Sequence, residues 1–230
     1  MTTEPSPDVS TQVVGVLGGT GPQGKGLAYR LSAAGQRVLV GSRDAARAEA
    51  AAAELNGLRV HATGVDIAGA DNTTVAEKSD IVIVAVPWDG HGALLESLRE
   101  QLAGKIVVDC VNPLGFDKQG AYALPVAEGS AAQQAAALLP DSRVTAAFHH
   151  ISAVLLLDPE VESIDTDVLV LGEDRAATDL VAALADRIPG IRGIFAGRLR
   201  NAHQVEALTA NLISVNRRYK AHAGVRVTDV

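Results

Sequence analysis

The sequence predicts an α/β fold: a Rossmann-like, doubly wound parallel sheet with a smaller carboxyl-terminal α/β domain. From Gln12 onward, short apolar runs alternate with helix-sized segments, which favours right-handed crossovers and hence parallel strands. A glycine-rich stretch, GGTGPQG at positions 18–24, follows the first of these runs. Apolar residues make up 47% and charged residues 20% of the 230, as in ordinary globular domains, so the chain can bury a core of this kind.

The first half of the chain contains five strand-like runs separated by helical segments. Each run is apolar and short enough to be a buried parallel strand. We expect strands at 12–18, 36–41, 58–64, 80–87 and 104–113. Helices are expected from the glycine-rich stretch through Leu31, and over 44–55, 71–78 and 91–102. Residues 114–129 lack periodicity and contain three glycines and a proline, which predicts a loop.

The second half of the chain continues the alternation of predicted strands and helices, but with different spacing. We expect a helix over 130–139, a strand over 143–148, a strand–helix–strand unit over 167–172, 174–188 and 191–197, and a final helix over 202–221. The polar opening 1–11, with two prolines, is expected to be a flexible tail. This change in the spacing of the predicted elements favours a main domain over 12–150 and a smaller one over 151–230, although the last third could instead extend the same sheet.

The glycine-rich stretch satisfies the dinucleotide-binding pattern G-x-G-x-x-G through Gly19, Gly21 and Gly24. The first glycine permits a tight turn, the second lets the backbone approach a pyrophosphate, and the third lets helix and strand pack closely. The N–H groups of the following helix then point at the anion. The stretch lies between a predicted strand and a predicted helix, so a dinucleotide site is favoured over a simple turn.

The end of the second predicted strand distinguishes between two dinucleotides. An NAD-binding chain usually places a carboxylate there, whereas this chain has Ser42 and Arg43. A hydroxyl and a guanidinium suit the 2′-phosphate of NADP. Arg47, one helical turn on, and Thr20, inside the glycine stretch, could add to this site. The sequence therefore predicts NADP, the alternative being that Arg43 and Arg47 are solvated surface charges.

Net charge, cysteine content and the absence of certain motifs argue against several other functions. A net charge of −7 argues against nucleic acid as the main partner, and no apolar run reaches the roughly 20 residues of a membrane span. The single cysteine, Cys110, is consistent with a reducing, cytoplasmic location. No nucleophile motif and no metal-ligand spacing occurs, and hydride transfer between two redox rings needs neither. Pro87, at the end of the fourth predicted strand, could set the tilt of such a ring or could simply end the strand.

Four segments together resemble one family. VGVLGGTGPQGKGLA, VLVGSR, IVIVAVPW and KIVVDCVNPL are similar to the NADPH-dependent coenzyme F420 reductases, also called F420:NADP oxidoreductases. The resemblance implies reversible hydride transfer between reduced coenzyme F420 and NADP⁺. It implies that 12–150 binds NADP and that 151–230 closes over a cleft for the deazaflavin, in a homodimer.

The resemblance also assigns site residues. It implies 2′-phosphate contacts from Thr20, Ser42, Arg43 and Arg47. It implies deazaflavin contacts from His149, Ile151, His203 and Thr209, with His149 as the group beside the reacting ring. The sequence departs from the family pattern at His203, where an arginine is expected, and at Ala207, where a serine is expected.

Other interpretations of these residues stay open. His149 could be a buried histidine at a strand end, and His203 could face solvent on the last helix. The basic stretch 216–226, with Arg217, Arg218, Lys220 and Arg226, could attract the phosphate and glutamyl tail of the deazaflavin, or could complement the dipole of the last helix.

Two rival functions also remain open. One is an NADPH-dependent imine or carbonyl reductase, whose proton donor would be His149, His150, Tyr122 or His203. The other is a redox sensor that binds NADP without turnover.

Overall fold

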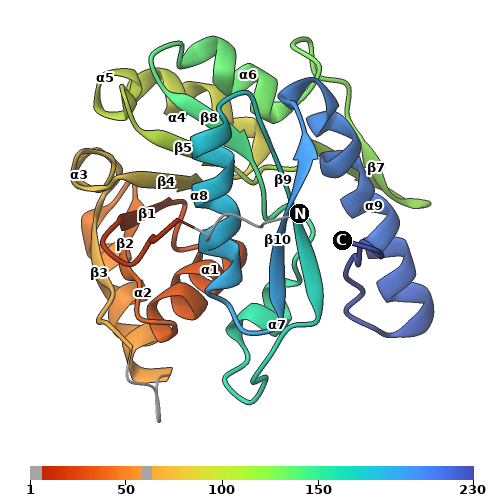
Figure 1. The fold of residues 1–230 in the computed structure, drawn as a ribbon, viewed down its shortest axis with the longest axis horizontal. Coiled ribbons are helices and arrows are strands. Elements are labelled where there is room, and N and C mark those ends of the chain that lie inside the picture. Colours follow the sequence, from red (N-terminus) through yellow and green to blue (C-terminus); the bar gives the residue numbers. More distant parts are fainter. Residues whose placement is uncertain (1–6, 59–63) are drawn as a thin grey trace.

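An eight-stranded sheet runs through the part of the chain that the structure describes, residues 7–58 and 64–230 of a computed structural model (Figure 1). Its strand order is β10-β9-β8-β5-β4-β1-β2-β3, and every neighbouring pair is parallel except β8 and β9. The strands are β1 (Val13–Leu17), β2 (Arg37–Ser42), β3 (Ala68–Asp71), β4 (Ile81–Val84), β5 (Ile106–Asp109), β8 (Arg143–Ala146), β9 (Thr166–Gly172) and β10 (Ile191–Gly197).

Helices cover both faces of this sheet. The core on one face includes side chains of α1 (Pro22–Ala33), α2 (Ala45–Leu58), α7 (Ala153–Leu157) and α8 (Arg175–Asp186). The core on the other face includes side chains of α3 (Asn72–Lys78), α4 (His91–Ser97), α5 (Arg99–Leu102), α6 (Ala131–Leu138) and α9 (Ala202–Tyr219). Two short 3₁₀ helices, η1 (Trp88–Gly90) and η2 (Leu199–Asn201), precede α4 and α9.

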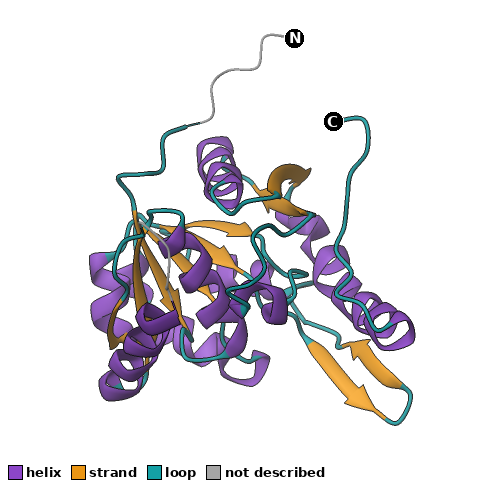
Figure 2. Ribbon diagram, turned by 90° about the horizontal axis from the view of Figure 1, so that it is seen from below, coloured by secondary structure: helices purple, strands orange, loops and turns teal. Residues whose placement is uncertain are grey.

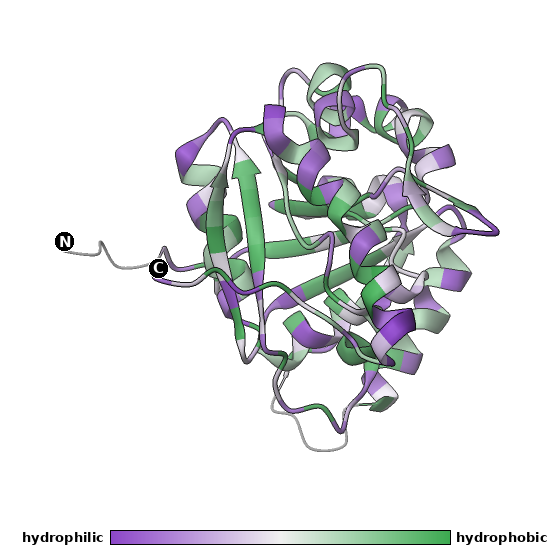
Figure 3. Cartoon of the chain, turned by 90° about the vertical axis from the view of Figure 1, so that its right-hand side faces the viewer, coloured by the Kyte–Doolittle hydropathy of each residue, from purple (hydrophilic) through white to green (hydrophobic). Residues whose placement is uncertain are grey.

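Residues of the central strands are buried on both faces, as parallel strands require. In β4, Ile81 and Ile83 belong to one core while Val82 and Val84 belong to the other, and all four side chains are fully buried. Figure 3 shows these strands as the most hydrophobic part of the chain, beneath helices of mixed character. The near-continuous apolar runs in the sequence follow from this double burial.

The structure corrects two of the predicted elements. The loop expected over 114–129 contains an antiparallel hairpin, β6 (Leu114–Asp117) and β7 (Gly120–Ala123), which extends from the body of the molecule (Figure 2). Neither strand is packed into a core, so no apolar pattern marks them. The single helix expected over 91–102 is interrupted at Leu98, whose φ of −111° and ψ of 11° leave the helical range and separate α4 from α5.

The third strand, expected over 58–64, falls almost entirely on residues outside the described part of the chain. Leu58 is the last residue of α2, and the strand that pairs with β2 is β3, at 68–71. The remaining predicted strands and helices are found within a few residues of their expected positions, and the strand expected over 191–197 is β10.

The last third of the chain extends the same sheet, the second of the two arrangements considered above. Strand β9 joins β8 through only two register pairs, Thr145 with Gly172 and Ala146 with Leu171.

Part of the segment 1–11, which is expected to be a flexible tail, is packed against the rest of the chain. Val9 is buried, and its carbonyl accepts a hydrogen bond from the Gln36 side chain at 2.9 Å.

Candidate functional site

The glycine-rich stretch forms the connection from β1 to α1. Gly18 has a φ of +74°, which favours glycine, and the Gly21 N–H donates to the Gly18 carbonyl at 3.0 Å to close a tight turn. Gly21 is the N-cap of α1, and Pro22 takes the first helical position, where its missing N–H costs nothing. The first turn of α1 is thereby presented at the carboxyl edge of the sheet.

The three motif glycines differ in what requires them. A Cβ on Gly24 would lie 2.7 Å from the Gly18 carbonyl oxygen, and a Cβ on Gly19 would lie 2.7 Å from the Cβ of Val40. Packing within the protein therefore explains both. A Cβ on Gly21 would meet only the Gly18 oxygen, at an ordinary 3.5 Å. Nothing within the described protein requires glycine at position 21, whereas a ligand that approaches the backbone there would, so the loop fits a pyrophosphate.

The end of β2 lies beside this loop. The Gly19 N–H donates to the Gly41 carbonyl at 3.1 Å, which places the segments that carry Thr20 and Ser42 next to each other. Ser42 is buried, and its Oγ accepts the Asp44 N–H at 3.3 Å.

Two guanidinium groups follow Ser42. Arg43 and Arg47 are exposed, and neither forms an ion pair within the described residues. The Asp44 carboxylate accepts the Ala46 N–H at 3.0 Å, in the first turn of α2. It therefore serves the helix N-terminus and leaves both guanidinium groups available to an anion.

A pocket of about 330 Å³ lies at the carboxyl ends of β4 and β5, with residues of α9 along another side. Strand order reverses between β1 and β4, and such a switch point is where open α/β sheets bind ligands. Four of the predicted site residues line it, namely Pro87, His149, Ile151 and Thr209. The other lining residues are Gln23, Ala85, Val86, Trp88, Cys110, Val111, Asn112, His150, Ser152, Leu212, Ile213 and Asn216.

His149 is held at this pocket by its backbone. Its carbonyl accepts hydrogen bonds from the Asn112 side chain at 2.8 Å and from the Thr209 hydroxyl at 3.1 Å. The preceding residue, Phe148, has a φ of +66°, an uncommon conformation for a bulky residue, and its carbonyl accepts the Gln23 amide at 3.1 Å. Helix α1, the segment after β5 and helix α9 therefore converge on residues 148–149.

The His149 ring is neutral. Burial lowers its pKa to about 4, despite the opposing influence of Asp109, and neither ring nitrogen has a hydrogen-bond partner in the described structure. The neighbouring His150 donates from Nε2 to the Asp167 carbonyl at 2.6 Å, and burial lowers its pKa as well. Both His149 nitrogens and Nδ1 of His150 thus lack a hydrogen-bond partner within the described residues, and both side chains line the pocket, which fits a site that has further ligand contacts to make.

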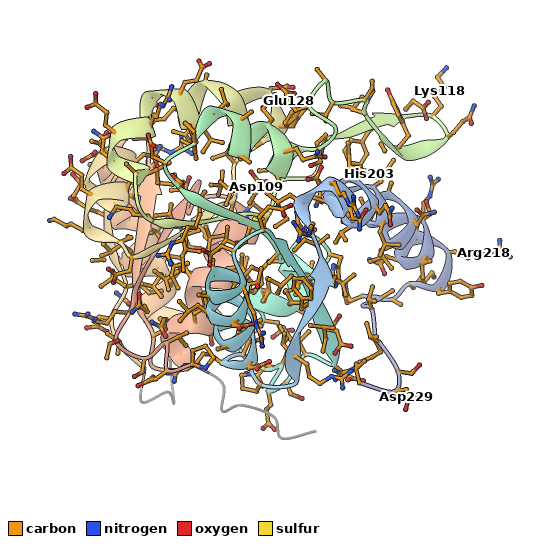
Figure 4. All side chains as sticks on the ribbon, turned by 45° about the horizontal axis from the view of Figure 1, so that its top comes forward. Asp109, Lys118, Glu128, His203, Arg218 and Asp229 are labelled. Atoms are coloured by element: carbon orange, nitrogen blue, oxygen red, sulfur yellow. The ribbon has the colours of Figure 1, made fainter. Side chains whose placement is uncertain are left out.

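His203 does not join the other predicted contacts. It lines a second pocket, of about 280 Å³, between β7, the segment after it and α9, together with Glu206 and Ala207 (Figure 4). Among the rival proton donors, Tyr122 lies half-exposed on the hairpin and lines none of these pockets.

The arginines of the basic stretch 216–226 have different surroundings. Arg226 pairs with Asp165 and with Asp167, the latter at 2.6 Å. Arg217 and Arg218 are exposed in the last turn of α9, where cations complement the helix dipole (Figure 4).

Several chemistries find no support in the described part of the chain. It has no group of three or more potential metal-ligating side chains, and none of its helices has the length and apolar character to cross a membrane. Cys110 is buried, donates from Sγ to the Val84 carbonyl, and burial raises the pKa of its thiol, so it is not an activated nucleophile.

Sequence reasoning missed Gln23 and Asn112, whose amides bind the 148–149 backbone. The position of Asn112, a polar residue near the carboxyl end of a predicted strand, could have predicted a place in the site. Nothing in the sequence near Gln23 predicts its contact, because its partner lies 125 positions away.

The chain is similar to known proteins over most of its length. Residues 13–113 match the family described as NADP oxidoreductase, coenzyme F420-dependent. The chain is 39% identical to the F420-dependent NADP reductase of Methanothermobacter marburgensis, over 94% of this chain and 98% of that protein. This chain belongs to the F420-dependent NADP reductase family. The corresponding protein of Methanocaldococcus jannaschii is 36% identical over the same share of each chain.

A solved structure supports the same assignment. A protein of Arthrobacter sp. FB24, described as a candidate F420-dependent NADP reductase, is 26% identical to this member of the family with a TM-score of 0.76, over 94% of this chain and 99% of that one. The family segment 13–113 contains the glycine loop and the end of β2, whereas the relatives extend over nearly the whole chain and so include α9.

Proposed function

We propose that the protein is an oxidoreductase that transfers a hydride reversibly between reduced coenzyme F420 and NADP⁺. The observation that carries this proposal is the position of the pocket: a glycine loop built for a dinucleotide lies at the same edge of the sheet as a largely apolar pocket between β4, β5 and α9. Membership of the F420-dependent NADP reductase family supports the same pair of substrates.

NADP is bound at the glycine loop and the end of β2. The loop of Gly19, Gly21 and Gly24 holds the pyrophosphate at the N-terminus of α1, with Gly21 leaving room for the ligand while Gly19 and Gly24 let the loop pack closely. The 2′-phosphate is bound by Thr20, Ser42, Arg43 and Arg47, which supply hydroxyl donors and guanidinium groups that form no ion pair among the residues the structure describes.

The pocket holds the reacting rings. Pro87, His149, Ile151 and Thr209 set the tilt and separation of the rings, and the apolar wall excludes water. The reduced deazaflavin gives up a hydride to NADP⁺ and a proton to solvent, so the pair supplies the redox chemistry. His203, in the second pocket, contacts only a part of the substrate that extends beyond the ring.

A carbonyl or imine reductase has less support. Such an enzyme needs a proton donor beside the nicotinamide. Burial lowers the pKa of both His149 and His150, which disfavours the protonated form that would act as the donor, and Tyr122 and His203 lie outside the pocket. A sensor without turnover is separated from the proposed enzyme only by measurement.

We also propose a cytoplasmic homodimer without nucleic-acid partners. The acidic net charge of −7 disfavours nucleic acid. Exposed apolar side chains support a second copy as partner, since Phe116 on the protruding hairpin is 69% exposed and Phe195 on the edge strand β10 is 60% exposed.

The deciding experiment mixes purified protein with NADPH and oxidised coenzyme F420 and follows the loss of the deazaflavin's visible absorbance, with NADH in parallel. Rapid bleaching with NADPH and far slower bleaching with NADH is the expected result. NADPH binding without bleaching would refute the proposed acceptor and favour the sensor, or a reductase acting on another substrate.

A further inference from the structure

A row of four hydrogen-bonded polar groups leads from the protein surface to the wall of the pocket. Glu128 Oε2 accepts from Gln134 Nε2 at 3.3 Å, Gln134 Oε1 lies 3.0 Å from His91 Nδ1, and His91 Nε2 lies 2.5 Å from Asp109 Oδ2. Figure 4 labels both ends of this row, with Glu128 at the edge of the molecule and Asp109 inside it. The His91 and Asp109 side chains are fully buried.

The donors and acceptors in this row determine the charge of His91. The exposed Glu128 carboxylate can only accept, so Gln134 turns its NH₂ group toward Glu128 and its oxygen toward His91. Asp109 is a second acceptor on the other side of the ring. Both ring nitrogens must therefore donate, and only an imidazolium carries two N–H groups.

The charges around His91 favour this state. Burial opposes the charged ring, but the hydrogen bond and charge of Asp109, the hydrogen bond of Gln134 and the more distant Glu206 of α9 together raise the pKa of His91. His149, which also lies near Asp109, is neutral at physiological pH and does not oppose the shift.

This ion pair contacts two adjacent parts of the pocket wall. The His91 ring lies against Trp88, with 5.4 Å between ring centroids, and Trp88 lines the pocket. Asp109 Oδ1 accepts the Val111 N–H at 3.0 Å and thereby holds the segment 110–112, which also lines the pocket.

We propose that His91, as an imidazolium held between Gln134 and Asp109, is a positioning residue for hydride transfer that fixes Trp88 and the segment 110–112. The proposal deepens the proposed function and rests on it for the identity of the reaction. Losing the proton from His91 removes one of its two hydrogen bonds and lets this wall shift. A displacement of about 1 Å at reacting groups lowers turnover by up to roughly 10²-fold.

Gln134→Met provides the test, because it removes the Nδ1 acceptor while keeping length and helix propensity. The matched control is Gln133→Met, one position away and outside the row. Trp88 is the only tryptophan in the chain, so quenching of its fluorescence by a neighbouring imidazolium reports on His91 directly. Ring ¹⁵N NMR of the labelled protein counts the protons on His91 independently.

In the unmodified protein, we expect both His91 nitrogens to be protonated at pH 7, with Trp88 emission rising as His91 loses its proton at higher pH. In Gln134→Met, that transition and the alkaline limb of kcat move together to lower pH, while the Kd of NADPH changes less than twofold. Gln133→Met moves neither. A neutral His91 at pH 7, or a kcat limb that stays in place while the fluorescence transition moves, overturns the proposal. Failure of F420 reduction by the unmodified protein overturns the proposed function instead, and the NMR and fluorescence results still decide the state of His91.

Discussion

The hydroxyl of Thr209 donates a hydrogen bond to the backbone carbonyl of His149 at 3.1 Å, although 60 positions separate the two residues. The same carbonyl accepts the Asn112 amide at 2.8 Å. Helix α9 and the segment after β5 are thus joined at one backbone atom, and no hydrogen bond within the described structure orients the buried His149 ring.

His149→Ala should lower turnover by roughly tenfold or more, the rate equivalent of about 1.4 kcal/mol, while NADPH binding stays nearly unchanged. The reason is that the ring lines the pocket, whereas the glycine loop does not depend on it. Steady-state kinetics beside an NADPH titration gives the comparison. Unchanged turnover would remove His149 from the site.

Arg43→Ala should weaken NADP(H) by about 1–3 kcal/mol, the range for hydrogen bonds to charged groups, and should hardly affect NAD(H). The matched control is Arg143→Ala, an exposed arginine at the amino end of β8, on the opposite edge of the parallel strands. Calorimetric Kd values for both cofactors decide it. An equal loss for NADP(H) and NAD(H) would mean that Arg43 does not recognise the 2′-phosphate.

Gly21→Ala and Gly24→Ala should differ in what they damage. The Gly21 Cβ has room and a φ of −83°, so we expect stability to change by no more than about 0.5 kcal/mol while NADPH affinity falls sharply. The Gly24 Cβ would lie 2.7 Å from a carbonyl oxygen, so unfolding free energy should drop by roughly 1–3 kcal/mol. Denaturant melts and NADPH titrations of both variants measure the contrast. Destabilisation by Gly21→Ala would assign that glycine to folding.

Glu206 should make stability depend on pH. Burial raises its pKa to about 7, although the N–H groups of Ala131 and Ala132 oppose the shift. The folded state thus holds this proton more tightly than the unfolded state, where the pKa is near 4.5. Its contribution is fully present below pH 4.5 and is lost as pH rises through 7, with a slope of up to about 1.4 kcal/mol per pH unit.

The measurement for Glu206 is the unfolding free energy of the unmodified protein minus that of Glu206→Gln, between pH 4.5 and 8. We expect the difference to fall with pH, because the variant cannot titrate at this position. A difference that is flat over this range would show that Glu206 keeps an ordinary pKa in the folded protein.

Phe116→Asp should convert a homodimer into monomers, because a carboxylate cannot be buried at an apolar interface without a partner. Sedimentation velocity at several protein concentrations measures the change, and Lys118→Asp, at the tip of the same hairpin (Figure 4), controls for added negative charge. A monomeric unmodified protein would remove the homodimer from the proposal.

The sequence predicted well what local chemistry controls. A few neighbouring residues are enough to predict the glycine loop and the doubly buried strands such as 81–84. The helix and strand predicted there are confirmed. The hairpin 114–123 was missed because neither of its strands is packed into a core. Its sequence therefore lacks the alternation of apolar and polar residues that predicts a strand. The buried His91 and Asp109 pair was missed because its members come from different elements and meet only when α4 packs beside β5.

The two register pairs between β8 and β9 are the only strand pairing between two parts of the described sheet. On one side lie six parallel strands, including β1 with its glycine loop, and on the other lie β9 and β10, which run in the opposite direction. The same few pairs leave the reversed strands to be held mainly by packing, as where Arg30 of α1 donates hydrogen bonds to the carbonyls of Leu155, Leu156, Asp158 and Val161.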